Sequence, residues 1–352
     1  MLVLSETDVS AILRGLSAEH ATQLLDTLCA ALAGFTKDKA QSDGPPLIHQ
    51  PQRTAITTRH NATTLIMPVS NTTAQAVKVV TLPQKGPVKG SVSVFAANGE
   101  LKGVLNAAEV TAFRTALTTM TLLTRCQNVR VEELVVFGAG KQVEWHLRLA
   151  LKFLPVGGAG AVRKIAIFNR GAARLLDLER DVLSELRRCF PEVAFQAVAE
   201  EGNAAYKQQV RTALKGADAI FCCTPSTTPL FAASDLPPAR GKTLFMSLIG
   251  SYKPEMQEID TETLQSAVQI WVDAREECLV EAGELIRAKV EPDELTEVGE
   301  LFSQGPTAKL IYDETPLIIF KCVGLALMDL VIGEALLEMG KKLGKGIQVD
   351  DF

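Results

Sequence analysis

Two glycines in the middle of the chain have the spacing of a dinucleotide-binding turn. The apolar run ELVVF ends at Phe137, Gly138-Ala139-Gly140 follows, and a helical pattern begins directly after it. The first glycine allows the tight turn, the second lets the backbone approach a pyrophosphate, and the helix start supplies N–H donors. Val143 stands where the motif usually has Gly or Ala, so a purely structural turn is the alternative interpretation.

The end of the next apolar run indicates which dinucleotide would bind. NAD sites place a carboxylate about 20 residues after the glycines, where it accepts a hydrogen bond from the ribose 2′-hydroxyl. Here the run KIAIF is followed by Asn169-Arg170, and Arg174 comes one helical turn later. Because arginine can bind a phosphate through two hydrogen bonds, the sequence favours NADP(H) over NAD(H). A solvated arginine at a helix start is the alternative.

Three cations in the first third of the chain could bind a carboxylate. Arg53 opens a strand in PQRT, Lys78 lies in the middle of the β run AVKVV, and Arg114 begins RTALTT in a predicted helix. Arginine pairs with a carboxylate through two hydrogen bonds, and lysine adds a point charge. A single lysine within a strand usually faces solvent, and spacing alone does not show that the three cations converge.

The elements that would position these residues have two different patterns. Short runs rich in Val, Ile and Thr between 53 and 105 predict strands, with helices after Ser5 and Ser17 before them and a helix over 107–125 after them. From residue 131 onward, short apolar runs alternate with helical stretches, which is typical of a parallel sheet in a doubly wound domain. We expect this sheet to end near residue 311.

The last segment predicts an apolar helix that lies beyond the parallel sheet. It begins at Thr315-Pro316, a good N-cap followed by proline, and its apolar positions are Leu317, Ile318, Phe320, Val323 and Leu327. With no partner in the sheet, this helix is expected to pack on the N-terminal domain. The predicted fold class is therefore α/β, with one discontinuous domain at 1–126 and 313–352 and a Rossmann-type domain at 127–312.

Composition and charge exclude several classes of protein. The 352 residues are 47% hydrophobic and 22% charged, which excludes a wholly disordered or collagen-like chain. With 36 basic and 41 acidic residues the net charge is −5, so we expect no nucleic-acid partner. We also expect no membrane span, no signal peptide and no metal site, and seven scattered cysteines without a CxxC pair predict a cytoplasmic protein.

The motifs, taken together, resemble those of the ornithine cyclodeaminase/mu-crystallin family. They follow the family's order over nearly the whole chain: PQRT (51–54), Met67-Pro68, KVVT (78–81), RTA (114–116), GAGKQ (138–142), Asn169-Arg170, CTPSTTPLF (223–231), IGSYKPEMQEID (249–260) and FKCVG (320–324). The resemblance implies an N-terminal substrate-binding and dimerisation domain, completed by the C-terminal helix, around an NADP-binding Rossmann domain. It implies a homodimer that acts on a small carboxylate-bearing imine or amino acid.

The resemblance also implies roles for individual residues. The substrate would be bound by Arg53, Met67, Lys78 and Arg114. The cofactor would be bound by Thr115, Gly138, Ala139, Gly140, Lys141, Gln142, Asn169, Arg170, Arg174, Thr224, Ser226, Ser247 and Ile249. Cations and dinucleotide would then act on one substrate.

One position departs from the pattern of true ornithine cyclodeaminases. These enzymes carry an aspartate two residues before the proline of the segment that here reads GSYKP, and this chain has Tyr252 there. A phenol with an ordinary pKa near 10 is a poor base at neutral pH, whereas cyclodeamination must move an amine proton and expel ammonia. Reduction of a cyclic ketimine needs a hydride and one proton donor, for which Lys78 and Tyr252 are the candidates.

The residues and the resemblance together predict an NADPH-dependent ketimine reductase. It would convert Δ1-pyrroline-2-carboxylate or Δ1-piperideine-2-carboxylate into the cyclic amino acid. Three alternatives stay open: an ornithine cyclodeaminase, an open-chain or N-alkyl amino-acid dehydrogenase, and a small-ligand-binding protein without catalysis. The presence of Arg53, Lys78 and Arg114 favours chemistry over storage.

Overall fold

The structure, a computed structural model, describes residues 1–41, 44–84, 86–127, 129–237, 243–305, 308–312 and 317–352. The chain divides into two units. Unit 1 comprises Met1–Thr118, Phe302–Pro306 and Gly324–Phe352, and unit 2 comprises Thr119–Leu301 and Thr307–Val323. Helix α3 (Ala107–Leu123) and helix α11 (Val298–Ser303) each contribute residues to both units.

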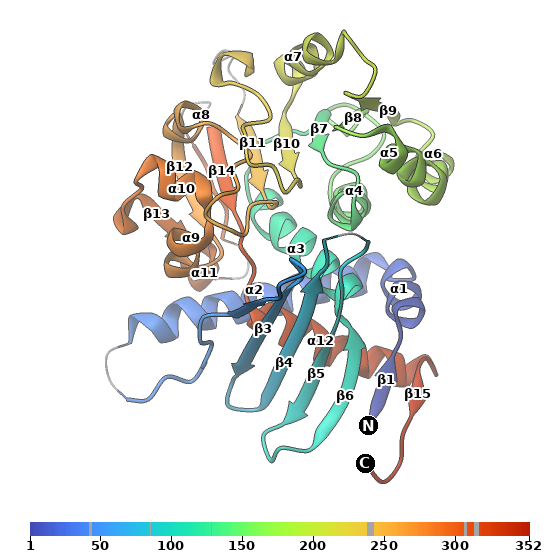
Figure 1. The fold of residues 1–352 in the computed structure, drawn as a ribbon, viewed down its shortest axis with the longest axis vertical. Helices are drawn as coiled ribbons and strands as arrows, with labels where there is room; N and C mark the ends of the chain where they lie inside the picture. Colours follow the sequence, from blue (N-terminus) through green and yellow to red (C-terminus); the bar gives the residue numbers. More distant parts are fainter. Residues whose placement is uncertain (42–43, 85, 128, 238–242, 306–307, 313–316) are drawn as a thin grey trace. The chain divides into compact units, whose positions relative to one another are not determined.

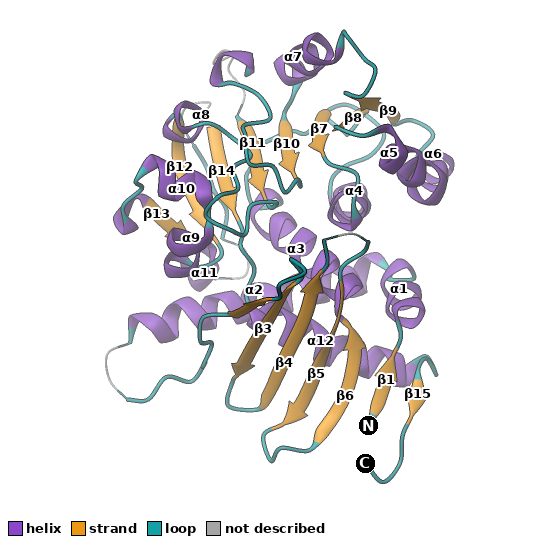
Figure 2. Cartoon of the chain, in the orientation of Figure 1, coloured by secondary structure: helices purple, strands orange, loops and turns teal. Residues whose placement is uncertain are grey.

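Unit 1 is built on a seven-stranded sheet in the order β15-β1-β6-β5-β4-β3-β2 (Figures 1 and 2). Its strands are β1 (Leu2–Leu4), β2 (Thr54–Thr57), β3 (Thr63–Ser70), β4 (Ala74–Leu82), β5 (Lys89–Ala96), β6 (Leu101–Asn106) and β15 (Ile347–Gln348). Its other helices are α1 (Glu6–Arg14), α2 (Ala18–Ala40) and α12 (Ala326–Lys342). Ser5 and Ser17 cap α1 and α2, as the sequence predicts.

The two faces of this sheet differ. Helix α12 packs against β3, β4, β5 and β6, and it crosses behind these strands in Figure 1. Along β3, buried residues such as Leu65 and Met67 alternate with half-buried residues such as Ile66 and Pro68. This alternation is typical of an antiparallel sheet whose one face packs on the core. Lys78 belongs to the buried set, since it lies opposite Met67 in the register of β3 and β4.

Unit 2 contains an eight-stranded sheet in the order β13-β12-β14-β11-β10-β7-β8-β9, whose described strand pairs are all parallel. Its strands are β7 (Glu133–Phe137), β8 (Lys164–Asn169), β9 (Ala194–Ala199), β10 (Ala219–Cys222), β11 (Leu244–Leu248), β12 (Ala267–Val272), β13 (Leu295–Glu297) and β14 (Leu317–Lys321). Neighbouring strands β7 and β10 mark the point where the strand order reverses, which is where open α/β sheets bind their ligands.

Helices connect the strands of unit 2. They are α4 (Lys141–Phe153), α5 (Ala172–Leu178), the π-helix η1 (Glu179–Leu183), α6 (Ser184–Cys189), α7 (Tyr206–Gly216), α8 (Thr261–Gln265), α9 (Arg275–Glu281) and α10 (Gly283–Ala288), with short 3-10 turns η2 (Ala233–Asp235) and η3 (Pro292–Glu294). The predicted α/β class with a Rossmann-type doubly wound domain is confirmed. None of the described helices has the length and apolar character that crossing a membrane requires.

The helix predicted from residue 316 onward is wrong in its first part. Leu317–Lys321 forms β14, which pairs with β11 on one side and β12 on the other, so the sheet continues beyond residue 311. Ile318 and Phe320 are fully buried. A short run that is apolar on both faces carries no periodicity to distinguish a strand from a helix. The C-terminal helix begins only at Ala326, and the predicted cap Thr315-Pro316 lies outside the described residues.

Candidate functional site

The glycine turn of unit 2 follows β7, at the reversal of strand order. Gly138 has φ +116°, and a Cβ there would lie 2.8 Å from the carbonyl oxygen of Cys223, at the end of β10. The fold itself therefore requires glycine at 138. In contrast, a Cβ on Gly140 would meet nothing within 4 Å, and its backbone is extended. Glycine at 140 is not needed for packing and leaves room for a ligand.

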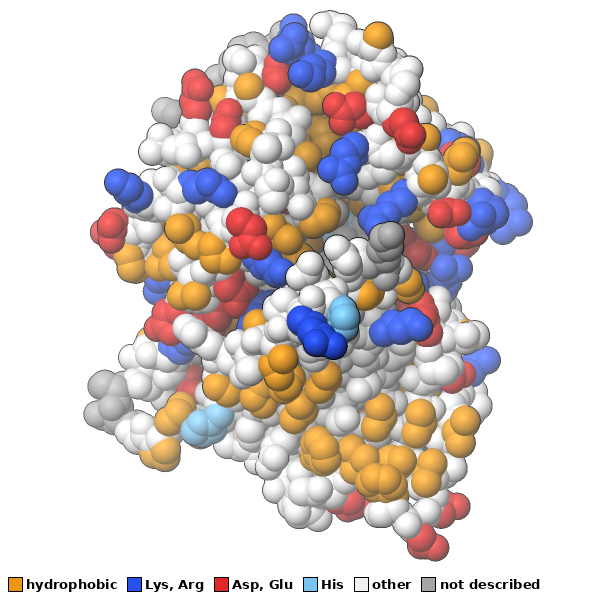
Figure 3. Space-filling model, in the orientation of Figure 1, with side chains coloured by type: hydrophobic (Ala, Val, Ile, Leu, Met, Phe, Trp, Pro, Cys, Tyr) orange, Lys and Arg blue, Asp and Glu red, His pale blue; other side chains and the backbone are white. Residues whose placement is uncertain are grey.

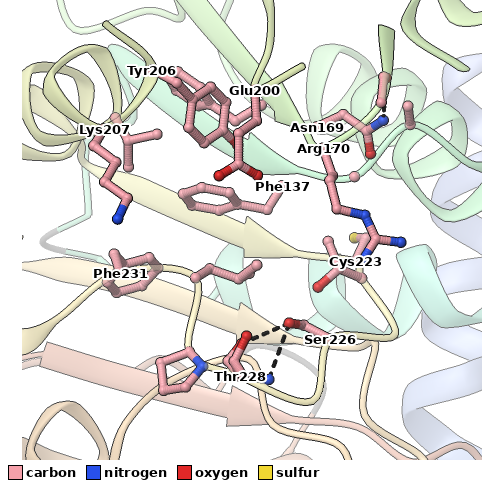
Figure 4. Close-up of a pocket in the computed structure, with 18 of the residues that line it drawn as sticks. Phe137, Asn169, Arg170, Glu200, Tyr206, Lys207, Cys223, Ser226, Thr228 and Phe231 are labelled. Carbon is pink, nitrogen blue, oxygen red and sulfur yellow. Dashed lines mark hydrogen bonds between the residues drawn. The ribbon is translucent and has the colours of Figure 1, made fainter. Parts of the chain in front are cut away.

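A cavity of about 1020 Å³ adjoins this turn (Figure 4). The ends of β7, β8, β9 and β10 and the loop over 223–232 form its walls. Eight of the predicted cofactor residues line it: Gly138, Ala139, Gly140, Asn169, Arg170, Arg174, Thr224 and Ser226. Residues far apart in the sequence therefore meet at one pocket of unit 2.

Aromatic rings form one side of the cavity. The ring centroids of Phe137 and Phe231 are 5.5 Å apart, and those of Phe137 and Phe168 are 5.8 Å apart. The ring of Tyr206 meets Phe168 edge-on, with the centroids again 5.8 Å apart. Figure 4 shows Phe137, Tyr206 and Phe231 on the side that faces Lys207. Such a wall can pack against a flat heterocycle such as adenine.

Charged side chains of both signs line the same cavity. Arg170, Arg174 and Lys207 contribute positive charge, and Glu200 and Glu201 follow β9. Glu201 Oε2 accepts the backbone N–H of Ala172 at 3.0 Å. Glu200 and Glu201 come from the end of the third strand of the domain, and not from the end of the second, where the sequence rule looks for a carboxylate. Two more carboxylates, Asp235 and Asp260, line the cavity from other segments.

The start of helix α4 fits a pyrophosphate. Gly140 is the N-cap residue and has no side chain to bind the first N–H groups of this 13-residue helix. Backbone donors and the helix dipole therefore remain for an anion, and Gly140 leaves the space that it would occupy. Together with the aromatic wall, these features fit a dinucleotide.

Five of the predicted cofactor residues do not line the cavity. Lys141 and Gln142 are the first residues of α4, and Ser247 and Ile249 are buried in and after β11. The Ser247 hydroxyl lies 2.9 Å from the Thr119 hydroxyl, which in turn lies 3.0 Å from Nε2 of the buried His146. Burial lowers the pKa of His146 to about 4, so the ring is neutral. Thr115, the fifth, is buried on α3 within unit 1.

Unit 1 brings two of the predicted cations, Lys78 and Arg114, to one carboxylate, and the third, Arg53, to a neighbouring carbonyl group. Lys78 Nζ lies 3.0 Å and 3.2 Å from the two oxygens of Asp329 on α12, and Arg114 Nε lies 3.4 Å from Oδ1. Arg53 donates to the carbonyl oxygen of Gly324 at 3.2 Å. A Cβ on Gly324 would lie 2.4 Å from Arg114 Nη1, so these groups pack tightly. We call Arg53, Lys78, Arg114 and Asp329 the cation cluster.

The electrostatics of the cation cluster favour a bound anion. Lys78, Arg114 and Asp329 are each at most 3% exposed, and two cations with one carboxylate give these three buried side chains a formal charge of +1. Burial lowers the pKa of Lys78 to about 8, with Asp329 acting in the opposite direction and Arg114 and Arg53 lowering it further. Excess buried charge is costly unless it is paired. A substrate carboxylate would supply that pairing.

Tyr252, the other predicted catalytic residue, lies in unit 2 on the loop after β11. It is half-buried and is not among the residues that line the cavity. Burial, with the nearby Glu255, raises the pKa of its phenol above the ordinary value of 10.0. The hydroxyl is therefore a weaker acid than that of free tyrosine.

Asp329 is a functional candidate that the sequence analysis missed. Its signal is a single carboxylate inside the apolar helix sequence ALMDLVIG. A charge in such a run has to find a cation, because an unpaired buried carboxylate costs several kcal/mol. The partner residues lie 251 and 215 positions away in the chain, at Lys78 and Arg114.

Comparison with known proteins identifies the family. Residues 10–341 match the model of the ornithine cyclodeaminase/mu-crystallin family. The rat ketimine reductase mu-crystallin is 27% identical over 318 residues, which cover 88% of this chain and 89% of the rat protein. An uncharacterized protein of Saccharomyces cerevisiae is 28% identical over 313 residues, which cover 80% of this chain and 82% of the yeast protein.

Among solved structures, the Δ1-pyrroline-2-carboxylate reductase of Thermococcus litoralis, in complex with NADH and L-proline, has the same fold. Its TM-score is 0.80 at 19% identity, and the match covers 99% of this chain and 100% of that chain. The family match spans both units, the glycine turn and the cation cluster. This chain therefore belongs to the ornithine cyclodeaminase/mu-crystallin family.

Proposed function

We propose that this protein is an NADPH-dependent reductase of cyclic ketimines, with Δ1-pyrroline-2-carboxylate or Δ1-piperideine-2-carboxylate as substrate. The observation that carries the proposal is the buried Lys78, whose Nζ lies 3.0 Å from the Asp329 carboxylate, with Nε of Arg114 at 3.4 Å from the same carboxylate. The names of the rat and T. litoralis relatives, both reductases of C=N bonds, support the same chemistry.

The cavity of unit 2 would hold the cofactor. The first N–H groups of α4 and the space at Gly140 suit the pyrophosphate, and the aromatic wall suits the adenine. Arg170 and Arg174 suit a 2′-phosphate. When bound, a reduced nicotinamide supplies a hydride to the imine carbon.

The cation cluster would bind the substrate and supply the proton. Arg53 and Arg114 orient the carboxylate of the imine, as guanidinium groups do. Lys78 donates two hydrogen bonds to Asp329, which leaves its third donor for the imine nitrogen. Reduction adds a hydride to the carbon of the C=N bond and the Lys78 proton to the nitrogen, and the product is a secondary amine. Lys78 is a better donor than Tyr252, because burial lowers the lysine pKa and raises the phenol pKa.

Steady-state oxidation of NADPH and NADH with a panel of substrates tests this proposal. The panel contains the two cyclic imines, open-chain 2-keto acids with ammonia or methylamine, and ornithine with the oxidised cofactors. We expect turnover with at least one cyclic imine and faster turnover with NADPH. Turnover only with open-chain substrates would indicate an amino-acid dehydrogenase, and binding of imines without oxidation of either cofactor would indicate a carrier.

Replacing Arg170 by alanine is expected to raise the Kd for NADPH about 10-fold or more, because one charge-assisted contact to the 2′-phosphate is lost. The Kd for NADH is expected to change less than about threefold, since NADH carries no such phosphate. Quenching or enhancement of the nicotinamide fluorescence measures both constants. Equal weakening for NADH and NADPH would contradict the role of Arg170 and would leave NADP preference without support.

We infer that the open face of the unit 1 sheet binds a second copy of this chain. The cross-strand row formed by Ile66, Val79, Ser91 and Asn106 contains no charged residue, and neither does the row of Pro68, Val77, Ser93 and Val104. Val79 is an apolar residue that is 37% exposed, and its cross-strand neighbours Ile66 and Ser91 are uncharged. Figure 3 shows hydrophobic side chains gathered over β3 to β6 on this face. Exposed apolar patches of this kind mark association surfaces.

Replacing Val79 by glutamate is therefore expected to convert a wild-type dimer into a monomer. Association would bury an unpaired carboxylate, which costs several kcal/mol and raises the dimer Kd about 100-fold or more. Sedimentation velocity measures the change, and Val280→Glu on α9 of unit 2, where the valine is 52% exposed, is the matched control. A monomeric wild type, or a dimeric Val79→Glu variant, would refute the assignment of this face.

A further inference from the structure

A buried polar cluster lies behind the wall of the nucleotide cavity in unit 2. It consists of Ser251, Glu258, Glu284 and Lys321, and we call it the Glu258 cluster. All four side chains belong to residues that are at most 2% exposed. None of them lines the cavity. Buried charges are costly unless they are paired and hydrogen-bonded.

The Glu258 carboxylate binds two loops at once. Its Oε1 accepts the backbone N–H of Thr224 at 2.7 Å and the Thr224 hydroxyl at 2.8 Å, on the loop after β10. Its Oε2 accepts the backbone N–H of Gly250 at 2.7 Å, on the loop after β11. One side chain therefore ties together the ends of two neighbouring parallel strands.

The backbone of Gln257 and Glu258 makes three more hydrogen bonds. The carbonyl oxygen of Glu258 accepts the N–H of Leu230 at 2.8 Å, and the N–H of Gln257 donates to the carbonyl oxygen of Ser226 at 2.7 Å. The N–H of Glu258 donates to Oε1 of Glu284 at 2.9 Å. The loop over 223–232, which lines the cavity, is thus held at Thr224, Ser226 and Leu230.

The rest of the cluster holds the residue before Tyr252. The Ser251 hydroxyl donates to Glu284 Oε2 at 2.5 Å. Lys321, the last residue of β14, donates to the carbonyl oxygen of Ser251 at 2.8 Å and to its hydroxyl at 2.6 Å. Ser251 is therefore hydrogen-bonded to residues of α10 and β14. These bonds fix the direction in which the loop after β11 leaves the sheet.

The loop after β10 and the loop after β11 are in close contact at Thr224 and Gly250. A Cβ on Gly250 would lie 1.8 Å from the carbonyl oxygen of Thr224, a distance that no side chain can occupy. The contact is therefore backbone against backbone, and the carboxylate of Glu258 spans it. Every described partner of this carboxylate is a donor, so the ionised form makes all three bonds. Burial nevertheless raises its pKa to about 7, with Lys321 opposing and Glu284 adding to that rise.

We propose that Glu258 is a positioning residue for hydride transfer. Its carboxylate holds the loop after β10, at Thr224, and the loop after β11, at Gly250, at a constant separation. The proposal rests on the proposed function, because the family resemblance implies that Thr224 and Ser226 line the nicotinamide side of the cofactor. Glu258 itself does not line the cavity. Its contribution is to the orientation of the nicotinamide end, while the adenosine end of the cavity is formed by other residues, such as Tyr206 and Arg170.

The variant Glu258→Gln tests this role. Glutamine keeps the size of the side chain, but its amide group presents two donors, so it can accept from Thr224 or from Gly250 and not from both. We expect hydrogen exchange of the Thr224 or Gly250 amide to accelerate about 10- to 100-fold, the range for one lost buried hydrogen bond. We expect kcat to fall about 10-fold with the imine substrate, and the Kd for 2′,5′-ADP, a probe of the adenosine end, to stay within about twofold.

The control is Glu262→Gln, an exposed glutamate on α8, which should change none of these quantities. Equal losses in kcat and in 2′,5′-ADP affinity would indicate a merely structural role, and unchanged amide exchange would overturn the proposal directly. If Glu258→Gln does not fold, hydrogen exchange of the wild-type protein tests the proposal instead. Rapid exchange of the Thr224 and Gly250 amides would exclude the contact of Glu258 with both loops. Protected amides in a protein that reduces no imine would contradict the proposed function alone.

Discussion

Replacing Lys78 by methionine is expected to abolish imine reduction while NADPH still binds. Methionine keeps the length and apolar stem of lysine but removes the proton donor and one of the three cations. General acid catalysis contributes about 10²- to 10⁴-fold, and a lost contact to the substrate carboxylate adds to that factor, so we expect kcat/KM to fall by about 10³-fold or more. The Kd for NADPH, for which we propose the cavity of unit 2 as the binding site, should change less than about twofold.

The matched control is Lys37→Met, at an exposed lysine on α2 of the same unit. It should leave kcat/KM unchanged. A Lys78→Met variant that retains reductase activity would refute the assignment of this lysine as proton donor. Loss of NADPH binding in the same variant would indicate that the substitution damages the fold instead of the chemistry.

The pH dependence of the wild-type enzyme follows from the same lysine. In the proposed mechanism the protonated ammonium of Lys78 is the active form, and burial chiefly lowers its pKa from 10.5 to about 8. Activity in the direction of reduction should therefore be nearly complete one pH unit below 8, about half at pH 8, and should approach a fall of about 10-fold per pH unit well above it. A profile of kcat/KM against pH, which reports groups of the free enzyme, measures this limb.

Replacing Asp329 by asparagine is expected to produce a large loss of stability in unit 1. The carboxylate is fully buried and accepts hydrogen bonds from Lys78 and Arg114. Its removal leaves those two buried cations without their common carboxylate. Breaking a buried ion pair from one side costs about 3–5 kcal/mol, and we expect a decrease of this size in the free energy of unfolding, measured by urea denaturation.

Glu334→Gln is a closely matched control for this prediction. Glu334 also lies on α12 and pairs with a lysine of the sheet, Lys102, at 2.6 Å, but the two side chains are 28% and 43% exposed. Exposed pairs contribute about 0–1 kcal/mol, so this variant should lose little stability. A loss of less than about 1 kcal/mol for Asp329→Asn would show that the cations do not depend on Asp329.

Asp329→Asn also predicts a kinetic change that simple destabilisation would not cause. The carboxylate raises the pKa of Lys78 against the effects of burial and Arg114. Without it, Lys78 should lose its proton at lower pH, and the alkaline limb of the kcat/KM profile should move from about pH 8 toward neutral pH. If activity falls but the alkaline limb of the profile does not move, Asp329 stabilises the cation cluster without setting the pKa of Lys78.

Sequence patterns were informative where function depends on consecutive residues. The run ELVVF followed by Gly138-Ala139-Gly140 predicted a strand, a turn and a helix, and the structure has β7, the turn and α4 at these positions. The same reasoning failed for 317–321, because a strand buried on both faces and a buried helix have the same composition. The sequence pattern also did not show on which face of the sheet the Lys78 side chain lies. A strand has two faces, and one residue does not show which of them packs on α12.

Neighbouring residues were thus enough to identify the glycine turn between a strand and a helix, the β-rich first part of the chain and the absence of an aspartate at position 252. Folding was needed to join Lys78 and Arg114 to Asp329, and to place Glu258 between Thr224 and Gly250. The physical reason lies in the range of the interactions. Dihedral preferences and periodicity act over a few residues, whereas a buried charge is satisfied by whichever partner the topology brings within hydrogen-bond distance, here as far as 251 positions along the chain.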